Sequence, residues 1–369
     1  MINKIISVYQ KLYKIKLRFD FPIPKKIILF DESHSSIFKE IIKKDFCILK
    51  TRDQKEVYFW IYLKQIIFFD FTFLTYCKNY IRYVSPKVLI TFIDTNKQFY
   101  ELKNSFSNIN FISVQNGCRV EKNTMFYNKL FTKTKKLKCD HIFVFNKYYI
   151  KEYQKIINSE YHVLGNFKNN IAKINKKKIN NDFLFISQFS NSNKINRKIE
   201  IKLVNFFKLY FDKSDKKLNI LLRNIHSAKD KKDEIEFYNK ILKSKCIFPK
   251  TNNWKKSYKI LDKFENIIFM YSTLGFEAIA RKKKVAIFSP IKDFDGKLNF
   301  AWPAPFQRKY DFFSAKDLTY NEIKRVLDNI KNCSQINWEK EYYSVIKDQL
   351  YMDKNNIKLK KIISKLILN

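Results

Sequence analysis

The chain has 369 residues, which is enough for two domains that each bury a hydrophobic core. Its hydrophobic content of 46% and aromatic content of 17% exclude a disordered protein, and its six cysteines form no CxxC pair that would indicate a zinc site or a disulfide framework. The formal net charge of +38 suits an anionic partner, but the lysines are spread along the whole chain, which argues against nucleic acid.

The sequence also gives expectations about location. The unpaired cysteines fit a reducing cytoplasm, and the N-terminal segment has no signal-peptide core. The most apolar window, residues 57–76, contains Lys64, Gln65 and Asp70, so we expect a buried amphipathic helix there and no membrane span. We therefore predict a cytoplasmic protein whose basic surface could dock on the inner face of the cytoplasmic membrane.

The first half of the chain predicts an alternation of buried strands and amphipathic helices. Strands are expected at residues 26–30, 87–93, 110–114, 140–145 and 161–164. Helices are expected at residues 36–44, 97–105 and 148–157, and residues 56–83 are helical or mixed.

Residues 167–182 are polar, rich in lysine and asparagine, and we interpret them as a linker. After them, strands are expected at residues 183–186, 218–222, 246–248, 267–271 and 285–288. Helices are expected at residues 194–211, 231–242, 257–264, 276–283 and 320–332, followed by a long amphipathic helical tail.

This alternation on both sides of one linker predicts an α/β protein with two Rossmann-like, doubly wound domains that face a central cleft. The predicted domains are residues 1–166 and residues 183–369, the second including the helical tail. Ligands of such sheets bind at the carboxyl ends of the strands, so polar residues at these ends are the candidates for a site.

The stretch NIIFMYSTLGFEAIARKKKVAIFSP, residues 266–290, is the most informative one. Two apolar runs flank the turn Ser272-Thr273-Leu274-Gly275 and a short helical segment, which predicts two parallel strands joined by a helix. Such a turn offers backbone N–H groups, two hydroxyls and the positive end of a helix dipole to a phosphate. Glu277 could accept hydrogen bonds from a ribose; alternatively, the segment is only a capped helix with an acid in its first turn.

Other predicted strand ends carry polar side chains. Arg223 follows a strand of the second half, where its guanidinium could bind a phosphate bidentately or be an ordinary surface group. Asp94 could be a helix N-cap, and Asn116-Gly117 could be a turn. The candidates in the first half are Asp31, Asp94, Asn96, Gln115, Asn116 and Gly117.

Several motifs of known chemistry are absent. The sequence has no GxGxxG, GxxxxGK[ST], GxSxG or HExxH motif, and its four histidines show no ligand spacing. We therefore predict no metal site and no bound cofactor.

Four segments, YSTLGFEAIARKKKVAIF, ITFIDTNKQFYELK, FISVQNGCR and VLGNFKNN, resemble the bacterial surface-carbohydrate biosynthesis proteins. These are GT-B glycosyltransferases related to the Kdo and sialic-acid-like sugar transferases of capsule and O-antigen assembly. The resemblance covers residues 26–313, and its most specific part begins at Ser272. A similar pattern occurs in the CDP-glycerol glycerophosphotransferases. Ser289-Pro290 stands where the sialyltransferase-like groups have His-Pro, which argues against a CMP donor.

The resemblance implies that the second domain binds a nucleotide-sugar donor and the first domain binds the acceptor. It implies that Ser272, Thr273, Leu274 and Gly275 hold the donor phosphate and that Glu277 holds the ribose. Asn96, Gln115, Asn116 and Gly117 would face the cleft on the acceptor side.

We therefore predict a metal-independent, inverting glycosyltransferase that moves a sugar from a nucleotide sugar to a cell-surface polysaccharide or lipid-linked glycan of capsule, O-antigen or lipopolysaccharide biosynthesis. Asp31 and Asp94 are the candidates for the general base, and Arg223 and the serine–threonine turn would stabilise the departing phosphate. We interpret Asp293-Phe294-Asp295 as structural or acceptor-facing. The alternatives are a CDP-glycerol glycerophosphotransferase-like polymer synthase and a non-enzymatic basic protein that binds nucleic acid or a membrane.

Overall fold

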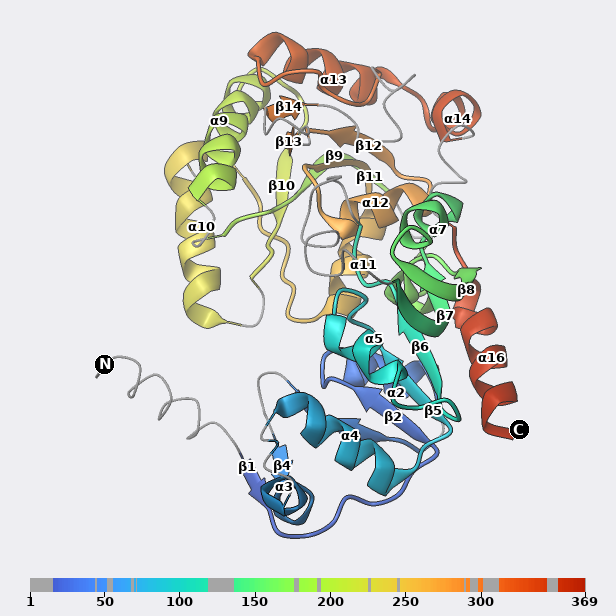
Figure 1. The fold of residues 1–369 in the computed structure, drawn as a ribbon. Helices are drawn as coiled ribbons and strands as arrows, with labels where there is room; N and C mark the ends of the chain where they lie inside the picture. Colours follow the sequence, from blue (N-terminus) through green and yellow to red (C-terminus); the bar gives the residue numbers. More distant parts are fainter. Residues whose placement is uncertain are drawn as a thin grey trace. The chain divides into compact units, whose positions relative to one another are not determined.

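The computed structural model describes residues 16–43, 45–51, 56–67, 70, 72–118, 136–175, 179–190, 194–224, 227–243, 246–288, 290–292, 298–300, 312–343 and 351–368. The chain divides into two compact units, whose elements are labelled in Figure 1. Unit 1 consists of Met1–Asn116, Met125–Ile171 and Asp353–Asn369, and unit 2 of Gly117–Thr124 and Ala172–Met352.

Unit 1 is built on a six-stranded parallel sheet with the strand order β3-β2-β5-β6-β7-β8. All four residues of β2 are fully buried, because helices cover both faces of a parallel sheet and its strands then carry no polar alternation. The strands are β2 (Ile27–Phe30), β3 (Cys47–Leu49), β5 (Val88–Thr91), β6 (Asn110–Val114), β7 (Leu137–Val144) and β8 (Ile157–Val163).

Five of these six strands are predicted from the sequence, and β3 is missed. This edge strand has only three residues, two of them partly exposed, so it lacks the apolar run that identifies the central strands. Strand β8 begins four residues earlier than predicted, because its exposed residues alternate with more buried ones, as on an edge.

The helices of unit 1 include two that resolve the ambiguous region of residues 56–83. This region forms β4 (Glu56–Tyr58), α3 (Phe59–Ile67) and α4 (Phe73–Val84), and β4 pairs in parallel with β1 (Lys16–Arg18). Among the residues that the structure describes, no helix combines the length and apolarity that crossing a bilayer requires. The other helices are α2 (Ser35–Ile41), α5 (Lys97–Lys103), α7 (Lys147–Tyr153), α8 (Phe167–Ile171), η3 (Lys354–Asn356) and α16 (Ile357–Leu368).

The C-terminal helix belongs to unit 1, whereas the sequence analysis assigned it to the second domain. Asn170 Nδ2 donates hydrogen bonds to Asn356 Oδ1 at 2.8 Å and to Leu164 O at 2.9 Å. Asn356 Nδ2 donates to Phe167 O at 3.0 Å, and both asparagines are buried. Helix α8, which supplies Asn170, occupies the start of the predicted linker. An amphipathic pattern predicts a helix but does not say which core its apolar side covers, and this explains the wrong assignment.

Unit 2 is built on a four-stranded parallel sheet with the order β10-β9-β11-β12. Its strands are β9 (Asn180–Ile186), β10 (Leu218–Leu221), β11 (Phe264–Phe269) and β12 (Lys284–Ile287). The predicted strand at residues 246–248 is a single bridge between Ile247 and Asn219. Ser314 forms a similar bridge with Ile287.

The helices of unit 2 follow the predicted alternation. Helices α9 (Lys194–Phe211) and α10 (Ala228–Leu242) pack against each other beside the sheet (Figure 1). The remaining elements are α11 (Trp254–Lys263), α12 (Thr273–Ala280), α13 (Tyr320–Asn332), α14 (Gln335–Asn337), η1 (Trp338–Tyr343) and the antiparallel pair β13 (Pro290–Lys292) and β14 (Leu298–Phe300). The prediction of two sheet-based α/β domains is confirmed.

The buried asparagine pair gives a stability prediction. Asn356→Ala should lower the free energy of unfolding by about 2 kcal/mol, because buried polar groups of the pair lose their partners. Asn355→Ala is the matched control, since Asn355 also has a positive φ of 61° but is exposed. It should cost only the left-handed preference of asparagine, about 1 kcal/mol. Urea unfolding of both variants measures the difference, and equal losses would contradict the role of the pair.

Candidate functional site

A cavity of about 350 Å³ lies at the carboxyl ends of β9, β10 and β11, three neighbouring strands of unit 2. Parallel strands end at the same edge of their sheet, so loops far apart in sequence meet there. The cavity is lined by residues 186–188 after β9, residues 221–223 after β10, residues 271–274 before and within α12, and Ser257 of α11. Four of the six predicted donor-binding residues line it: Arg223, Ser272, Thr273 and Leu274.

Helix α12 begins at this cavity. Ser272 is its N-cap residue, with φ −64° and ψ 131°, but its side chain makes no capping hydrogen bond within the described residues. The first N–H groups of a helix have no partner inside the helix, and the positive end of its dipole lies there. The Thr273 hydroxyl accepts a hydrogen bond from the Cys118 backbone N–H at 3.2 Å. The arrangement of N–H groups, hydroxyls and dipole suits an anion.

Arg223 adds a positive charge at the cavity. Its Nη1 donates to the backbone oxygens of Gln188, at 3.2 Å, and Phe189, at 3.3 Å, on the neighbouring loop. A guanidinium has five N–H donors, so these contacts leave donors for a ligand. The side chain is exposed and therefore accessible from solvent.

Gly275 and Glu277 are not among the described lining residues of the cavity. A Cβ atom on Gly275 would lie 2.1 Å from Cγ of Phe269, so glycine is required here for the close packing of α12 on β11. The buried Glu277 carboxylate accepts a hydrogen bond from the Tyr258 hydroxyl, and burial together with the charge of Glu277 raises the pKa of Tyr258. Glu277 therefore belongs to a buried polar cluster, and its contact with a ribose stays a prediction.

Two buried carboxylates, which the sequence analysis missed, hold the loops that line the cavity. Glu234 of α10 accepts hydrogen bonds from the backbone N–H groups of Arg223 and Asn224, both at 2.9 Å, and from the Ser187 hydroxyl. Three donors from two strand ends thus converge on one side chain. Glu234 lies four residues before Tyr238 on the buried stripe of α10, and an acid in such a stripe is the signal that could have identified it.

Glu200 of α9 holds the loop after β9 in the same way. Its Oε1 accepts hydrogen bonds from the Gln188 backbone N–H at 3.2 Å and from the Tyr238 hydroxyl at 2.6 Å. Its side chain is buried, and this burial raises the pKa of the Glu200 carboxyl. The two carboxylates therefore hold the loops after β9 and β10, and the second of these loops carries Arg223.

The predicted residues at the strand ends of unit 1 hold loops together. The buried Asp94 carboxylate accepts hydrogen bonds from the Asn116 backbone N–H at 3.2 Å and from the Tyr153 hydroxyl. Gln115 is also buried, and its Oε1 accepts from the Phe145 backbone N–H at 2.9 Å. These contacts join the ends of β5, β6 and β7. Asn116 and the adjoining Gly117, which is grouped with unit 2, are partly exposed.

Asp31 and Asn96 also lie in turns. Asp31 has a positive φ of 85°, and its Oδ1 accepts from the Ser33 backbone N–H at 2.7 Å, while its Oδ2 lies 3.4 Å from the Thr51 hydroxyl. The N-cap residue of α5 is Asn96, so the alternative role of Asp94 as N-cap is wrong. Ser289 and Asp293-Phe294-Asp295 lie outside the described residues.

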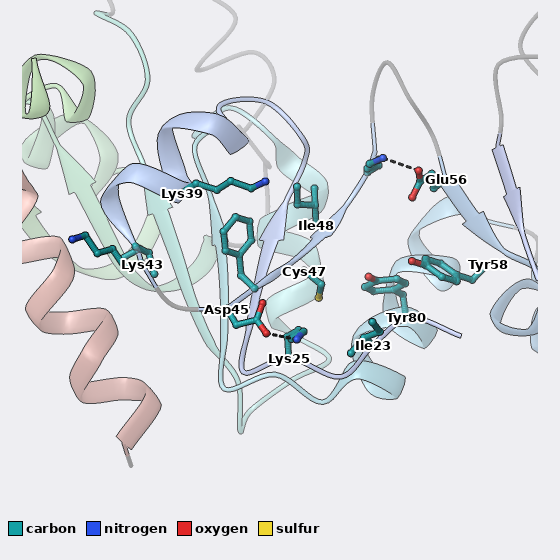
Figure 2. Close-up of a pocket in the computed structure, with 13 residues that line it drawn as sticks. Ile23, Lys25, Lys39, Lys43, Asp45, Cys47, Ile48, Glu56, Tyr58 and Tyr80 are labelled. Carbon is teal, nitrogen blue, oxygen red and sulfur yellow. Dashed lines mark hydrogen bonds and ion pairs between the residues drawn. The ribbon is translucent and has the colours of Figure 1, made fainter. Parts of the chain in front are cut away.

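Figure 2 shows a second cavity, of about 690 Å³, which the sequence analysis did not predict. It lies in unit 1 beside the edge strand β3, and four lysines and two acids are among its lining residues. Lys25 is paired with Asp45, and the pair Lys50–Glu56 has an N–O distance of 2.7 Å. The excess of lysines makes the cavity basic. The lysines are Lys25, Lys39, Lys43 and Lys50.

Comparison with known proteins gives a family and a fold. Residues 112–367 match the model of a family described as “putative O-antigen biosynthesis protein”, and no curated protein matches the chain. The predicted role in surface-glycan biosynthesis is thereby confirmed, while a specific relation to Kdo or sialic-acid transferases stays a prediction.

Several solved structures have the same fold. The UDP-GlcNAc 2-epimerase of Methanocaldococcus jannaschii, in complex with UDP-GlcNAc and UDP, has 14% identity and a TM-score of 0.56 over 92% of this chain and 99% of its own. A co-structure of S. aureus MnaA with UDP has 12% identity and a TM-score of 0.55 over 96% and 98%. A glycosyltransferase from Rickettsia africae has 12% identity and a TM-score of 0.52 over 94% and 99%. The predicted GT-B fold class is confirmed.

The raised pKa of Glu200 predicts a pH-dependent effect on stability. Because folding favours the protonated carboxyl, ionisation of Glu200 destabilises the folded state as pH rises above the ordinary glutamate pKa of about 4.3. Glu200→Gln keeps the accepting oxygen and removes this penalty. The free energy of unfolding of Glu200→Gln, minus that of the unchanged protein, should therefore be larger at pH 7 than at pH 4.

Urea unfolding at both pH values measures this difference. Glu236→Gln, on the exposed side of α10, is the control and should give a difference near zero. A Glu200→Gln effect that is the same at both pH values would contradict the argument.

Proposed function

This chain belongs to the family described as “putative O-antigen biosynthesis protein”, and on that premise we propose that it is a glycosyltransferase that moves a sugar from a nucleotide sugar to a surface glycan or its lipid-linked precursor. The observation that carries the proposal is the convergence of Arg223, Ser272 and Thr273 on one cavity at the start of α12. Negative charge builds up on the departing nucleotide phosphate during sugar transfer, and a fixed cation and helix N-terminus stabilise such charge.

We propose a uridine nucleotide as the first donor to test. UDP is bound in two of the similar structures, and one of these also contains UDP-GlcNAc. The glutamates beneath the cavity support a positioning role. By holding the backbone of Gln188, Arg223 and Asn224, the carboxylates of Glu200 and Glu234 keep the anion-binding groups in place before the donor arrives.

We propose that the general base is either Asp31 or Asp94. Both carboxyl groups lie at strand ends of unit 1, where they are buried and accept hydrogen bonds from loop backbone. An acceptor hydroxyl must therefore approach them from the side of these loops. The replacements Asp31→Asn and Asp94→Asn keep one accepting oxygen but take up no proton. Transfer activity should fall with only one of them, while folding is preserved in both.

We also propose that unit 1 makes peripheral contact with an anionic membrane. Phe19, Phe21 and Trp60 are exposed by 64%, 49% and 42%, and the rings of Phe21 and Tyr83 stack at 5.2 Å. Ile23, exposed by 68% and two residues after Phe21 in the sequence, is among the lining residues of the basic cavity of Figure 2. Aromatic rings suit the membrane interface, and lysines attract anionic headgroups. Co-sedimentation with anionic but not neutral vesicles, weakened by Phe21→Ser, is the expected result.

Epimerisation of the donor sugar is the alternative that the similar epimerase structures suggest. The two activities differ in their need for an acceptor. A transferase consumes the donor only when the acceptor is present, whereas an epimerase changes the sugar of the donor without one. A glycerophosphate transferase would instead consume CDP-glycerol, so product analysis with each donor separates the three.

Donor binding is tested by nucleotide titration. UDP should raise the melting temperature and bind measurably, because a ligand that binds only the folded state stabilises it. Arg223→Ala and Ser272→Ala should each weaken UDP binding roughly tenfold, the equivalent of about 1.4 kcal/mol. Arg325→Ala is the control, since Arg325 pairs with Glu322 on α13 and is not among the described lining residues of the cavity.

The titration is extended to CMP, CDP and GDP. Binding of another nucleotide with the same dependence on Arg223 would change the donor and keep the site. No binding by any nucleotide, or unchanged binding in both cavity variants, would overturn the proposal.

A further inference from the structure

Three side chains of unit 1 converge on one point at the edge of its sheet. His141 Nδ1 lies 3.2 Å from His162 Nε2 and 3.3 Å from Glu160 Oε2, and His162 Nε2 lies 3.4 Å from Glu160 Oε1. Among the described residues, these three form a group whose ligand atoms could hold a metal ion. The sequence analysis predicted no metal site, because the histidines show no ligand spacing in the sequence. The reason is that His141 and His162 belong to different strands.

The register of the sheet brings the three side chains together. His141 of β7 is paired directly with Glu160 of the edge strand β8, so both side chains lie on the same face. His162 lies two residues after Glu160 on β8, and residues two apart on a strand share a face. The arrangement therefore follows from the backbone pairing and does not depend on a flexible loop.

The distances match those of a tetrahedral metal site. With metal–ligand bonds of about 2.0–2.1 Å and tetrahedral angles, neighbouring ligand atoms around Zn²⁺ lie about 3.3 Å apart. The separation of 3.2 Å between the two ring nitrogens agrees with this value, and the two oxygens of the Glu160 carboxylate lie 3.3 Å from the His141 nitrogen and 3.4 Å from the His162 nitrogen. Two imidazole nitrogens and one glutamate oxygen are also a ligand set that zinc uses in proteins, with a fourth position left for water.

Hydrogen bonding alone does not satisfy the three contacts. Each neutral imidazole nitrogen here either carries a proton or has a lone pair, and the Glu160 carboxylate only accepts. If both nitrogens carry protons, the two N–H groups oppose each other; if only one does, the other lone pair faces the carboxylate. A cation at the centre is attracted to all three lone pairs at once.

The site is reachable from solvent. The Glu160 side chain is 65% exposed, whereas the side chains of His141 and His162 are 15% and 6% exposed. The two histidines form a partly buried base, and the glutamate closes the site from outside. Imidazole ligands select a transition metal over Mg²⁺ or Ca²⁺, which prefer oxygen.

We propose that His141, Glu160 and His162 form a binding site for Zn²⁺ or a similar divalent transition metal, which fastens the edge strand β8 to β7. The proposal is independent of the nucleotide cavity, since all three residues belong to unit 1. Its role is structural: a bound metal stabilises the folded state and is not required by the donor site.

The test is a Zn²⁺ titration of the purified full-length chain after treatment with a chelator. One equivalent should bind, and the melting temperature should rise on binding. Glu160→Gln should weaken Zn²⁺ binding at least tenfold without changing the melting temperature of the metal-free protein, because Glu160 is exposed. His141→Asn should abolish stoichiometric binding.

His34→Asn is the matched control. It removes a histidine elsewhere in unit 1, and asparagine tolerates the positive φ of 65° at that position. Its Zn²⁺ binding should equal that of the unchanged protein. Absorption of the Co²⁺ form should show tetrahedral nitrogen and oxygen ligation without a thiolate band. The proposal would be overturned by the absence of stoichiometric binding, by Glu160 and His141 variants that bind Zn²⁺ as tightly as the unchanged protein, or by a thiolate band from one of the cysteines.

Discussion

The parallel alignment of β10, β9, β11 and β12 is the constraint on which the candidate site depends. It brings three loops to one edge of a sheet, but it also leaves backbone N–H groups of those loops without strand partners. Glu234 and Glu200 supply the missing acceptors. Charged side chains are rarely buried unless they are paired in this way, so the two acids are best understood as part of the site's framework.

The strand ends of the two units are used differently. In unit 1, Asp94 and Gln115 point inward and accept hydrogen bonds from neighbouring strand ends, so polar residues close that edge. In unit 2 the acceptors come from helices behind the loops, and the strand-end side chains Arg223 and Ser272 line a cavity. Polar residues at the strand ends therefore hold neighbouring loops together in unit 1 and line a cavity in unit 2.

The high positive charge is spread along the chain, but some of the lysines lie together in the structure. Four lysines of unit 1 line the basic cavity, and the chain segment of its lining residue Ile23 also carries the exposed Phe19 and Phe21. Charge alone fits several classes of anionic partner, whereas lysines beside exposed aromatic rings fit a membrane interface more specifically.

The sequence by itself determined the architecture and the position of the serine–threonine turn that lines the cavity of unit 2. Buried parallel strands are continuous apolar runs, and the Ser272-Thr273-Leu274-Gly275 turn between two such runs can be recognised without coordinates. Only the tertiary structure showed short edge strands such as β3 and the unit to which α16 belongs. It also showed the hydrogen-bond partners of Glu277 and Asp94. The hydrogen bonds of Glu234 and the proximity of His141 to His162 were likewise visible only in the tertiary structure. Periodicity reports how much of a residue is buried, but its partner depends on which elements pack together, and strand pairing across the sheet leaves no local mark in the sequence.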